Sequence, residues 1–127
     1  MAVSITLLNN LRFELLNLHK TLIDMERSEY EWRHGKISAQ QFLQMLLKDP
    51  RFEWLHFLSE LIVKMDEMLD SKDPVSEEEL EGVFQTAKKL LDPDSIHETF
   101  AEKYRDAMQK DPAVVLAHQR VRQIFTS

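Results

Sequence analysis

The chain has 127 residues, of which 43% are hydrophobic and 30% are charged, and its formal net charge is −6. This length is typical of one domain with its own core, so we treat residues 1–127 as a single domain. The absence of cysteine excludes disulfides, zinc–thiolate sites and cysteine nucleophiles. Only two glycines are present, which argues against an all-β fold rich in tight turns.

The negative charge is concentrated in the second half of the chain. Residues 73–106 hold ten acidic and four basic side chains, whereas acids and bases balance in the remainder. Such a surface repels phosphate, so nucleic acid is not an expected partner. No apolar run approaches the roughly 18–20 residues of a membrane span, and the N-terminal segment is amphipathic rather than typical of a signal peptide. We therefore expect no membrane partner and a cytoplasmic protein.

Every proline follows an aspartate, in the pairs Asp49-Pro50, Asp73-Pro74, Asp92-Pro93 and Asp111-Pro112. Aspartate caps helix N-termini, and proline suits the first helical turn, where its missing N–H costs nothing. The pairs therefore separate helices or kink them. Sequence alone does not decide between these for Pro50 and Pro112. We favour kinks, since the apolar pattern resumes directly after Pro50 at Phe52 and Trp54.

Apolar residues at helical spacing run through almost the whole chain. A long helix is predicted over 4–33, with a seven-residue repeat that includes Leu11, Leu18, Met25 and Trp32. A second helix begins at the Ser38 cap and is kinked at Pro50. A third begins at a capping box of Ser76 and Glu79, and a fourth, kinked at Pro112, at a capping box of Ser95 and Glu98. The short connections favour an antiparallel up-down four-helix bundle with Pro-kinked second and fourth helices.

Two Glu-x-x-His pairs, Glu31 with His34 and Glu53 with His56, have the spacing of ligands in di-iron bundles. Such ligands must project into the bundle, whereas both pairs project away from the apolar faces. Pairing of His56 with Glu60 on the surface accounts for the second pair. We therefore interpret both as coincidence.

Polar side chains also interrupt the predicted apolar faces. His19 and Glu26 lie on the apolar face of the first helix, and Glu26 is flanked by Tyr30 and Arg33. A polar group on a buried face needs a partner, because leaving it unpaired costs about 1–3 kcal/mol. The other polar candidates are His118 and His97 in the last segment and Asp66 at the edge of the central helix.

Three interpretations of these residues stay open. The favoured one is a hydrogen-bonded network in the core. The second is a face left exposed as a dimer seam or pocket. The third is a mononuclear site for a transition metal such as Zn, Fe, Mn or Ni, formed by His19, His118 and either Glu26 or Asp66.

The segments Phe42–Asp73 and Phe100–Ile124 contain helix and turn features, namely Asp49-Pro50 through Trp54-Leu55, Leu58-Ser59-Glu60-Leu61-Ile62, Asp66-Glu67, and Asp111-Pro112 with Val114-Val115. On these features the chain resembles a group of small bacterial all-α proteins of unknown function. The resemblance implies an all-α fold and a bacterial cytosolic origin. It implies no activity.

No motif in the chain specifies a reaction. Gly35 and Gly82 stand alone, so no phosphate-binding glycine loop is present, and no serine lies in a nucleophile-elbow pattern. We predict a non-enzymatic helical bundle that acts through protein–protein contacts, with a homodimer as one form. The alternative is a metal-binding bundle with a His and carboxylate site in its core. No cofactor is predicted apart from the transition metal of that alternative.

Overall fold

A computed structural model describes residues 3–92, 94 and 98–126. In this part of the chain six α-helices and one 3-10 helix are present: α1 (Ile5–His34), α2 (Ala39–Lys48), η1 (Pro50–Leu55), α3 (His56–Asp70), α4 (Glu77–Leu90), α5 (Glu98–Lys110) and α6 (Pro112–Phe125). The prediction of an all-α fold is confirmed. The predicted Ser95 cap and His97 lie outside the described residues.

The long first helix is α1, and both of its ends have clear physical causes. The Ser4 hydroxyl accepts a hydrogen bond from the Leu7 amide at 3.1 Å, which satisfies one of the free donors of the first turn. At the other end Gly35 has a φ of 87°, a conformation that side chains with a Cβ rarely adopt, and its amide donates to the Glu31 carbonyl at 2.8 Å. The predicted boundaries of this helix are therefore confirmed to within one residue.

The two prolines that we expected to kink helices divide them instead. Asp49 and Asp111 both have extended backbones, the conformation that a following proline favours. Each aspartate carboxylate accepts a 2.9 Å hydrogen bond from the amide two residues later, which starts the next element. The four-helix bundle with kinked helices is thus not confirmed, since the second predicted helix is divided into α2, η1 and α3, and the fourth into α5 and α6.

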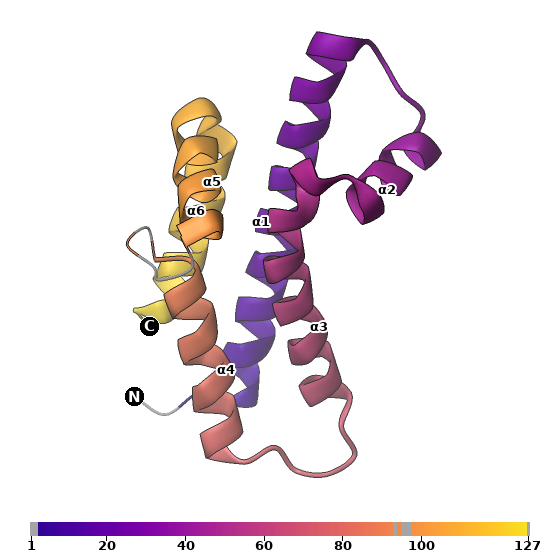
Figure 1. Ribbon diagram of the computed structural model, residues 1–127. Coiled ribbons are helices and arrows are strands. Elements are labelled where there is room, and N and C mark those ends of the chain that lie inside the picture. Colours follow the sequence, from indigo (N-terminus) through magenta and orange to yellow (C-terminus); the bar gives the residue numbers. More distant parts are fainter. Residues whose placement is uncertain (1–2, 93, 95–97, 127) are drawn as a thin grey trace.

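Helix α1 is the centre of the molecule (Figure 1). Helix α3 packs along one side of it, and α6 packs along another, with α5 beside α6. Helix α4 follows α3 through a connection at the lower end, whereas α2 is joined to the top of α1 by a loop and lies to one side of the body, against η1 (Figure 1). The molecule therefore has a packed body and one projecting helix.

The core consists of the apolar face of α1 and the residues that meet it. The buried stripe of α1 runs from Leu8 to Met25 and stops there. Helix α6 begins beside Met25, where Asp111 and Ala113 line a shared cleft, so it does not cover the last turns of α1. The prediction that Trp32 continues the buried repeat was wrong, because its side chain is 86% exposed.

Candidate functional site

The most buried polar pair lies between α5 and α6. Tyr104 Oη and His118 Nδ1 are 2.7 Å apart, and Tyr104 also stacks on Phe100 with ring centroids separated by 5.4 Å. Burial raises the pKa of Tyr104, and burial together with the Arg122 charge lowers the pKa of His118. Both shifts favour the neutral forms of the phenol and the imidazole, so the pair is a hydrogen bond between uncharged groups. His118 is thus a buried histidine with a hydrogen-bond partner on the neighbouring helix.

A cavity of about 300 Å³ adjoins His118 where α4 and α6 end. Lys88 of α4 and Arg122 of α6 line it, together with Asp92 and the ring of Phe125. Each cation lies in the last turn of its helix, where positive charge complements the free carbonyl groups. These charges therefore have a structural explanation, and we assign no ligand to the cavity.

Three of the predicted site residues come together at the upper end of α1. Glu26, Tyr30 and Arg33 line a small cleft with Arg51 of η1. The Arg51 guanidinium lies over the Tyr30 ring, 5.2 Å from its centroid, and pairs with Asp49 at 2.9 Å. This is a polar network between α1 and η1.

The pKa of Glu26 is raised, first by burial and then by the neighbouring Glu29. Lys103, Lys110 and Arg51 oppose that shift, so the carboxyl group lies among several cations. The cleft has a volume of about 90 Å³, which is well below the roughly 300 Å³ of a typical small-molecule site. We conclude that these residues connect structural elements.

His19 lies at a junction where α1 meets the end of η1 and the start of α3. Its pKa is lowered by burial and by the nearby His56, and is raised in part by the hydrogen-bonded carbonyl of Leu55. His56 Nε2 lies 2.9 Å from the Leu46 carbonyl, which connects the start of α3 to the end of α2. The structure thus gives His56 a partner on the neighbouring helix.

The remaining candidate, Asp66, pairs with Arg12 and so connects α3 to α1. Asp66, His19 and His118 therefore have separate sets of partners. Among residues 3–92, 94 and 98–126, no three His, Asp or Glu side chains are grouped so that they could hold a metal ion. The proposed metal ligands His19, His118, Glu26 and Asp66 therefore do not form a common site in the described part of the chain.

The feature that sequence reasoning missed is the second apolar face of α2. Phe42, Met45 and Leu46 of this ten-residue helix pack against the core. Leu43 and Leu47, one turn apart, are 53% and 61% exposed. Six of the ten residues of this short helix are apolar, which is more than one face of a helix needs. That surplus was the available sequence signal.

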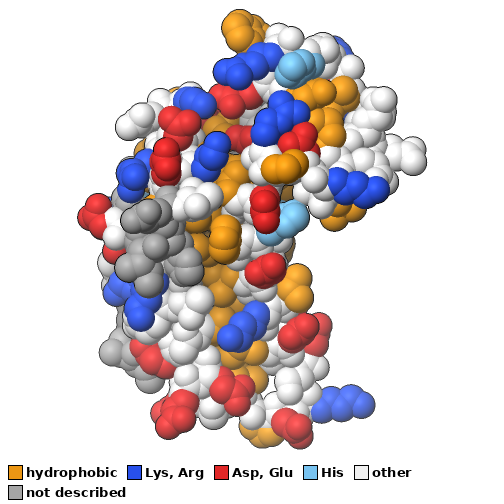
Figure 2. Space-filling view, in the orientation of Figure 1, with side chains coloured by type: hydrophobic (Ala, Val, Ile, Leu, Met, Phe, Trp, Pro, Cys, Tyr) orange, Lys and Arg blue, Asp and Glu red, His pale blue; other side chains and the backbone are white. Residues whose placement is uncertain are grey.

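The surface is hollowed below α2, and hydrophobic side chains reach it both under α2 and along α3 (Figure 2). His56, Ser59 and Val63 follow one side of α3 at helical spacing, and His56 contacts α2. Val63 therefore lies on the α2 side of α3, about two turns below the contact, and it is 52% exposed. We call the surface around Val63 on this side of α3 the α3 hollow. Leu43 and Leu47 of α2 lie above it.

Charge differs on the two sides of the α3 hollow. Residues 33–51, which we call the α2 lobe, carry four basic side chains (Arg33, Lys36, Lys48 and Arg51) and one acidic one (Asp49). Residues 53–70 carry five acidic side chains (Glu53, Glu60, Asp66, Glu67 and Asp70) and one basic one (Lys64). A positively charged apolar lobe thus borders a negatively charged apolar helix.

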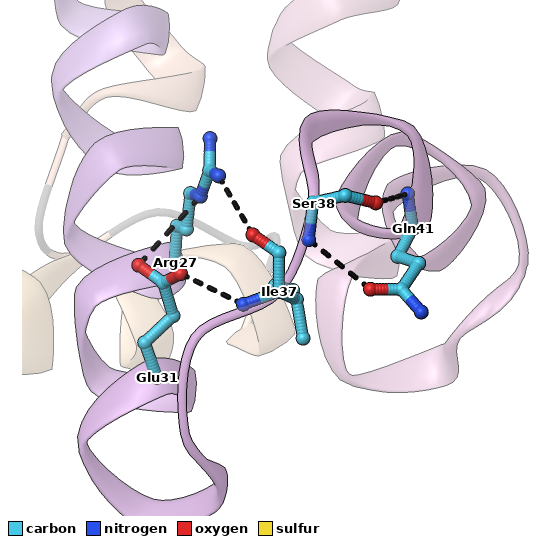
Figure 3. A network of polar contacts seen from close by, with 5 residues as sticks. All are labelled: Arg27, Glu31, Ile37, Ser38 and Gln41. Carbon is cyan, nitrogen blue, oxygen red and sulfur yellow. Dashed lines mark hydrogen bonds and ion pairs between the residues drawn. The ribbon is translucent and has the colours of Figure 1, made fainter.

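The α2 lobe is held in place by a polar network (Figure 3). Arg27 donates to the Ile37 carbonyl at 3.0 Å, and the Glu31 carboxylate accepts from the Ile37 amide at 3.0 Å. A reciprocal capping box then starts α2, with Ser38 and Gln41 bonded to each other's amides at 3.1 Å. The exposed leucines are therefore presented by an ordered helix.

No protein-family model, curated protein or solved structure matches the chain. The resemblance to small bacterial all-α proteins stays a prediction. Among the described helices, none combines the length and apolarity needed to cross a membrane. Function therefore has to be argued from the surface itself.

Proposed function

We propose that the chain is a non-enzymatic cytoplasmic helical protein that acts through protein–protein contacts at the α2 lobe and the α3 hollow. The carrying observation is the exposure of Leu43 and Leu47 on a helix that already buries its other apolar face. Contiguous exposed apolar surface bordered by charge is typical of protein-binding sites.

The polar residues elsewhere in the molecule support the choice of this surface. Each histidine that is buried or half-buried in the described residues has a partner, namely Tyr104 for His118, the backbone of Leu55 for His19 and the Leu46 carbonyl for His56. These arrangements supply structural hydrogen bonds. By contrast, nothing in the described body accounts for the exposed leucines of α2.

The test is to measure the mass of the complexes that the tagged chain forms in extract of its source cells, followed by reconstitution from purified components. Wild type is compared with the Leu43→Glu/Leu47→Glu variant. The matched control is Leu116→Glu, because Leu116 is 56% exposed on α6. We expect a complex with wild type and the control that is lost with the double variant. A chain that runs at its own mass of 15.0 kDa in all three cases would contradict the proposal.

A further inference from the structure

The following inference rests on the proposed function, because it names the partner of the same surface. We propose that this partner is a second copy of the chain, with the α2 lobe of each copy seated in the α3 hollow of the other. The result is a two-fold symmetric dimer in which the same contact occurs twice. Two-fold dimers of this kind are the commonest soluble assemblies.

Shape supports self-association. The α2 lobe projects from the body, and the hollow lies directly below it on the same side of the molecule (Figures 1 and 2). A two-fold interface requires that one surface be complementary to itself. A projection beside a hollow meets this requirement, because a half-turn of the second copy places each projection opposite a hollow.

Charge supports the same partner. The α2 lobe has four bases and one acid, and residues 53–70 have five acids and one base. The predicted contact therefore places the basic lobe of one copy against the acidic helix of the other. This attraction is local, and it opposes the general repulsion between two chains that each carry a net charge of −6.

The apolar groups also match. Leu43 and Leu47 on the lobe would pack against Val63, which is 52% exposed on α3. Apolar contact at the centre and charge at the rim is the usual anatomy of a specific interface.

The lobe is already organised for docking. The hydrogen bonds from Arg27 and Glu31 to Ile37 hold the segment that leads into α2 (Figure 3). A surface that is ordered before binding loses less conformational entropy when the complex forms. The exposed leucines can therefore contribute to association without further folding.

The first experiment measures the dimer dissociation constant of the purified full chain by sedimentation equilibrium. We expect Leu47→Glu and Val63→Glu each to weaken dimerisation by about tenfold or more, because each places a charge in the apolar centre. The controls are Leu116→Glu and Phe13→Glu, which add the same charge at exposed apolar positions on α6 and α1. We expect both controls to dimerise like wild type, with circular dichroism confirming that every variant is folded.

The second experiment reverses the charges. The Lys36→Glu/Lys48→Glu variant has an acidic lobe, and the Glu60→Lys/Glu67→Lys variant has a basic α3. Each alone should dimerise at least about tenfold more weakly than wild type, and higher salt should reduce this difference. An equimolar mixture should form a heterodimer, because both lobe-to-hollow contacts then join opposite charges.

Two results would overturn the inference. One is a wild type that stays monomeric up to about 1 mM, the weak end of specific binding. The other is a dimer that survives Val63→Glu but is lost with Phe13→Glu. Either result leaves the proposed function intact if the Leu43→Glu/Leu47→Glu variant loses a complex with a different, reconstituted protein. Failure in both systems would reject the interaction surface altogether.

Discussion

The α5–α6 hairpin and the α2 lobe use similar apolar residues in opposite ways. Phe100, Tyr104 and Val114 of the hairpin are fully buried, and even its histidine is paired inside the core. The lobe buries Phe42 but leaves Leu43 and Leu47 in water. A helix held between neighbours can bury most of its apolar side chains, although α6 still exposes Leu116, whereas a projecting helix covers only one face. The surplus apolar face of α2 is the basis of the binding surface that we propose.

The largest expected effect is in the hairpin. Phe100 is fully buried against Trp54 and Tyr104, so Phe100→Ala should lower the free energy of unfolding by about 3–5 kcal/mol. Urea unfolding followed by circular dichroism measures this loss. The matched control is Trp32→Ala, which removes an exposed aromatic and should change stability by no more than about 0.5 kcal/mol. Equal losses in the two variants would contradict the described core.

The next effect tests whether the lobe is a separate unit. Phe42 is the buried aromatic of α2 and packs edge-on against Phe52, with ring centroids 5.8 Å apart. Phe42→Ala should speed amide hydrogen exchange in residues 39–48, while the exchange of α1 and α6 stays close to that of wild type. The urea midpoint should fall less than it does for Phe100→Ala. A loss of protection throughout the molecule would show that lobe and body unfold together.

An intermediate loss of stability is expected when the buried Tyr104–His118 pair of the hairpin is broken. Tyr104→Phe removes the hydroxyl and leaves His118 Nδ1 buried without its partner. The expected cost is about 1–3 kcal/mol, measured by urea unfolding at neutral pH. Tyr30→Phe is the matched control, since Tyr30 is half-exposed and keeps its stacking with His34 and Arg51. If both tyrosine variants lose the same stability, the buried pair has no special role.

A smaller effect should appear as a pH dependence of stability. Burial lowers the pKa of His19 and of His118 below the ordinary 6.5, so the unfolded chain takes up protons more readily. Their contribution to stability is thus largest above pH 6.5 and falls as the pH is lowered through that value. His19→Gln should flatten the urea midpoint between about pH 7.5 and 5.5. A wild type whose midpoint is constant over this range would refute the prediction.

The smallest effect has the opposite sign. Because the pKa of Glu26 is raised, its ionised form is less favourable in the folded chain, and the cost is present above the folded pKa. Glu26→Gln should therefore stabilise the chain at pH 7, by less than about 1 kcal/mol because the side chain is partly exposed to solvent. The gain should disappear below pH 4.5, which thermal unfolding at the two pH values can measure. Destabilisation at pH 7 would show that the cations around Glu26 outweigh its burial.

Much of the local structure was predictable because it depends on neighbours in the chain. The Ser38 cap and the Ser76 start depend on hydrogen bonds within one helical turn, and both are confirmed. Pairing partners were not predictable in this way. The partner of His118 lies 14 residues away on another helix, and that of Asp66 lies 54 residues away. Helical projection places a side chain on a face but does not show what covers that face.

The sequence by itself therefore determined the helices, their caps and most of the buried stripe, because those features follow from propensity, capping and apolar period. Only the tertiary structure decided that Pro50 and Pro112 begin new elements. It also decided that the buried face of α1 ends at Met25, although the helix continues beyond that residue. It also decided that α2 projects with Leu43 and Leu47 exposed. These outcomes depend on which helix ends meet in space, since a face is buried only where another element reaches it.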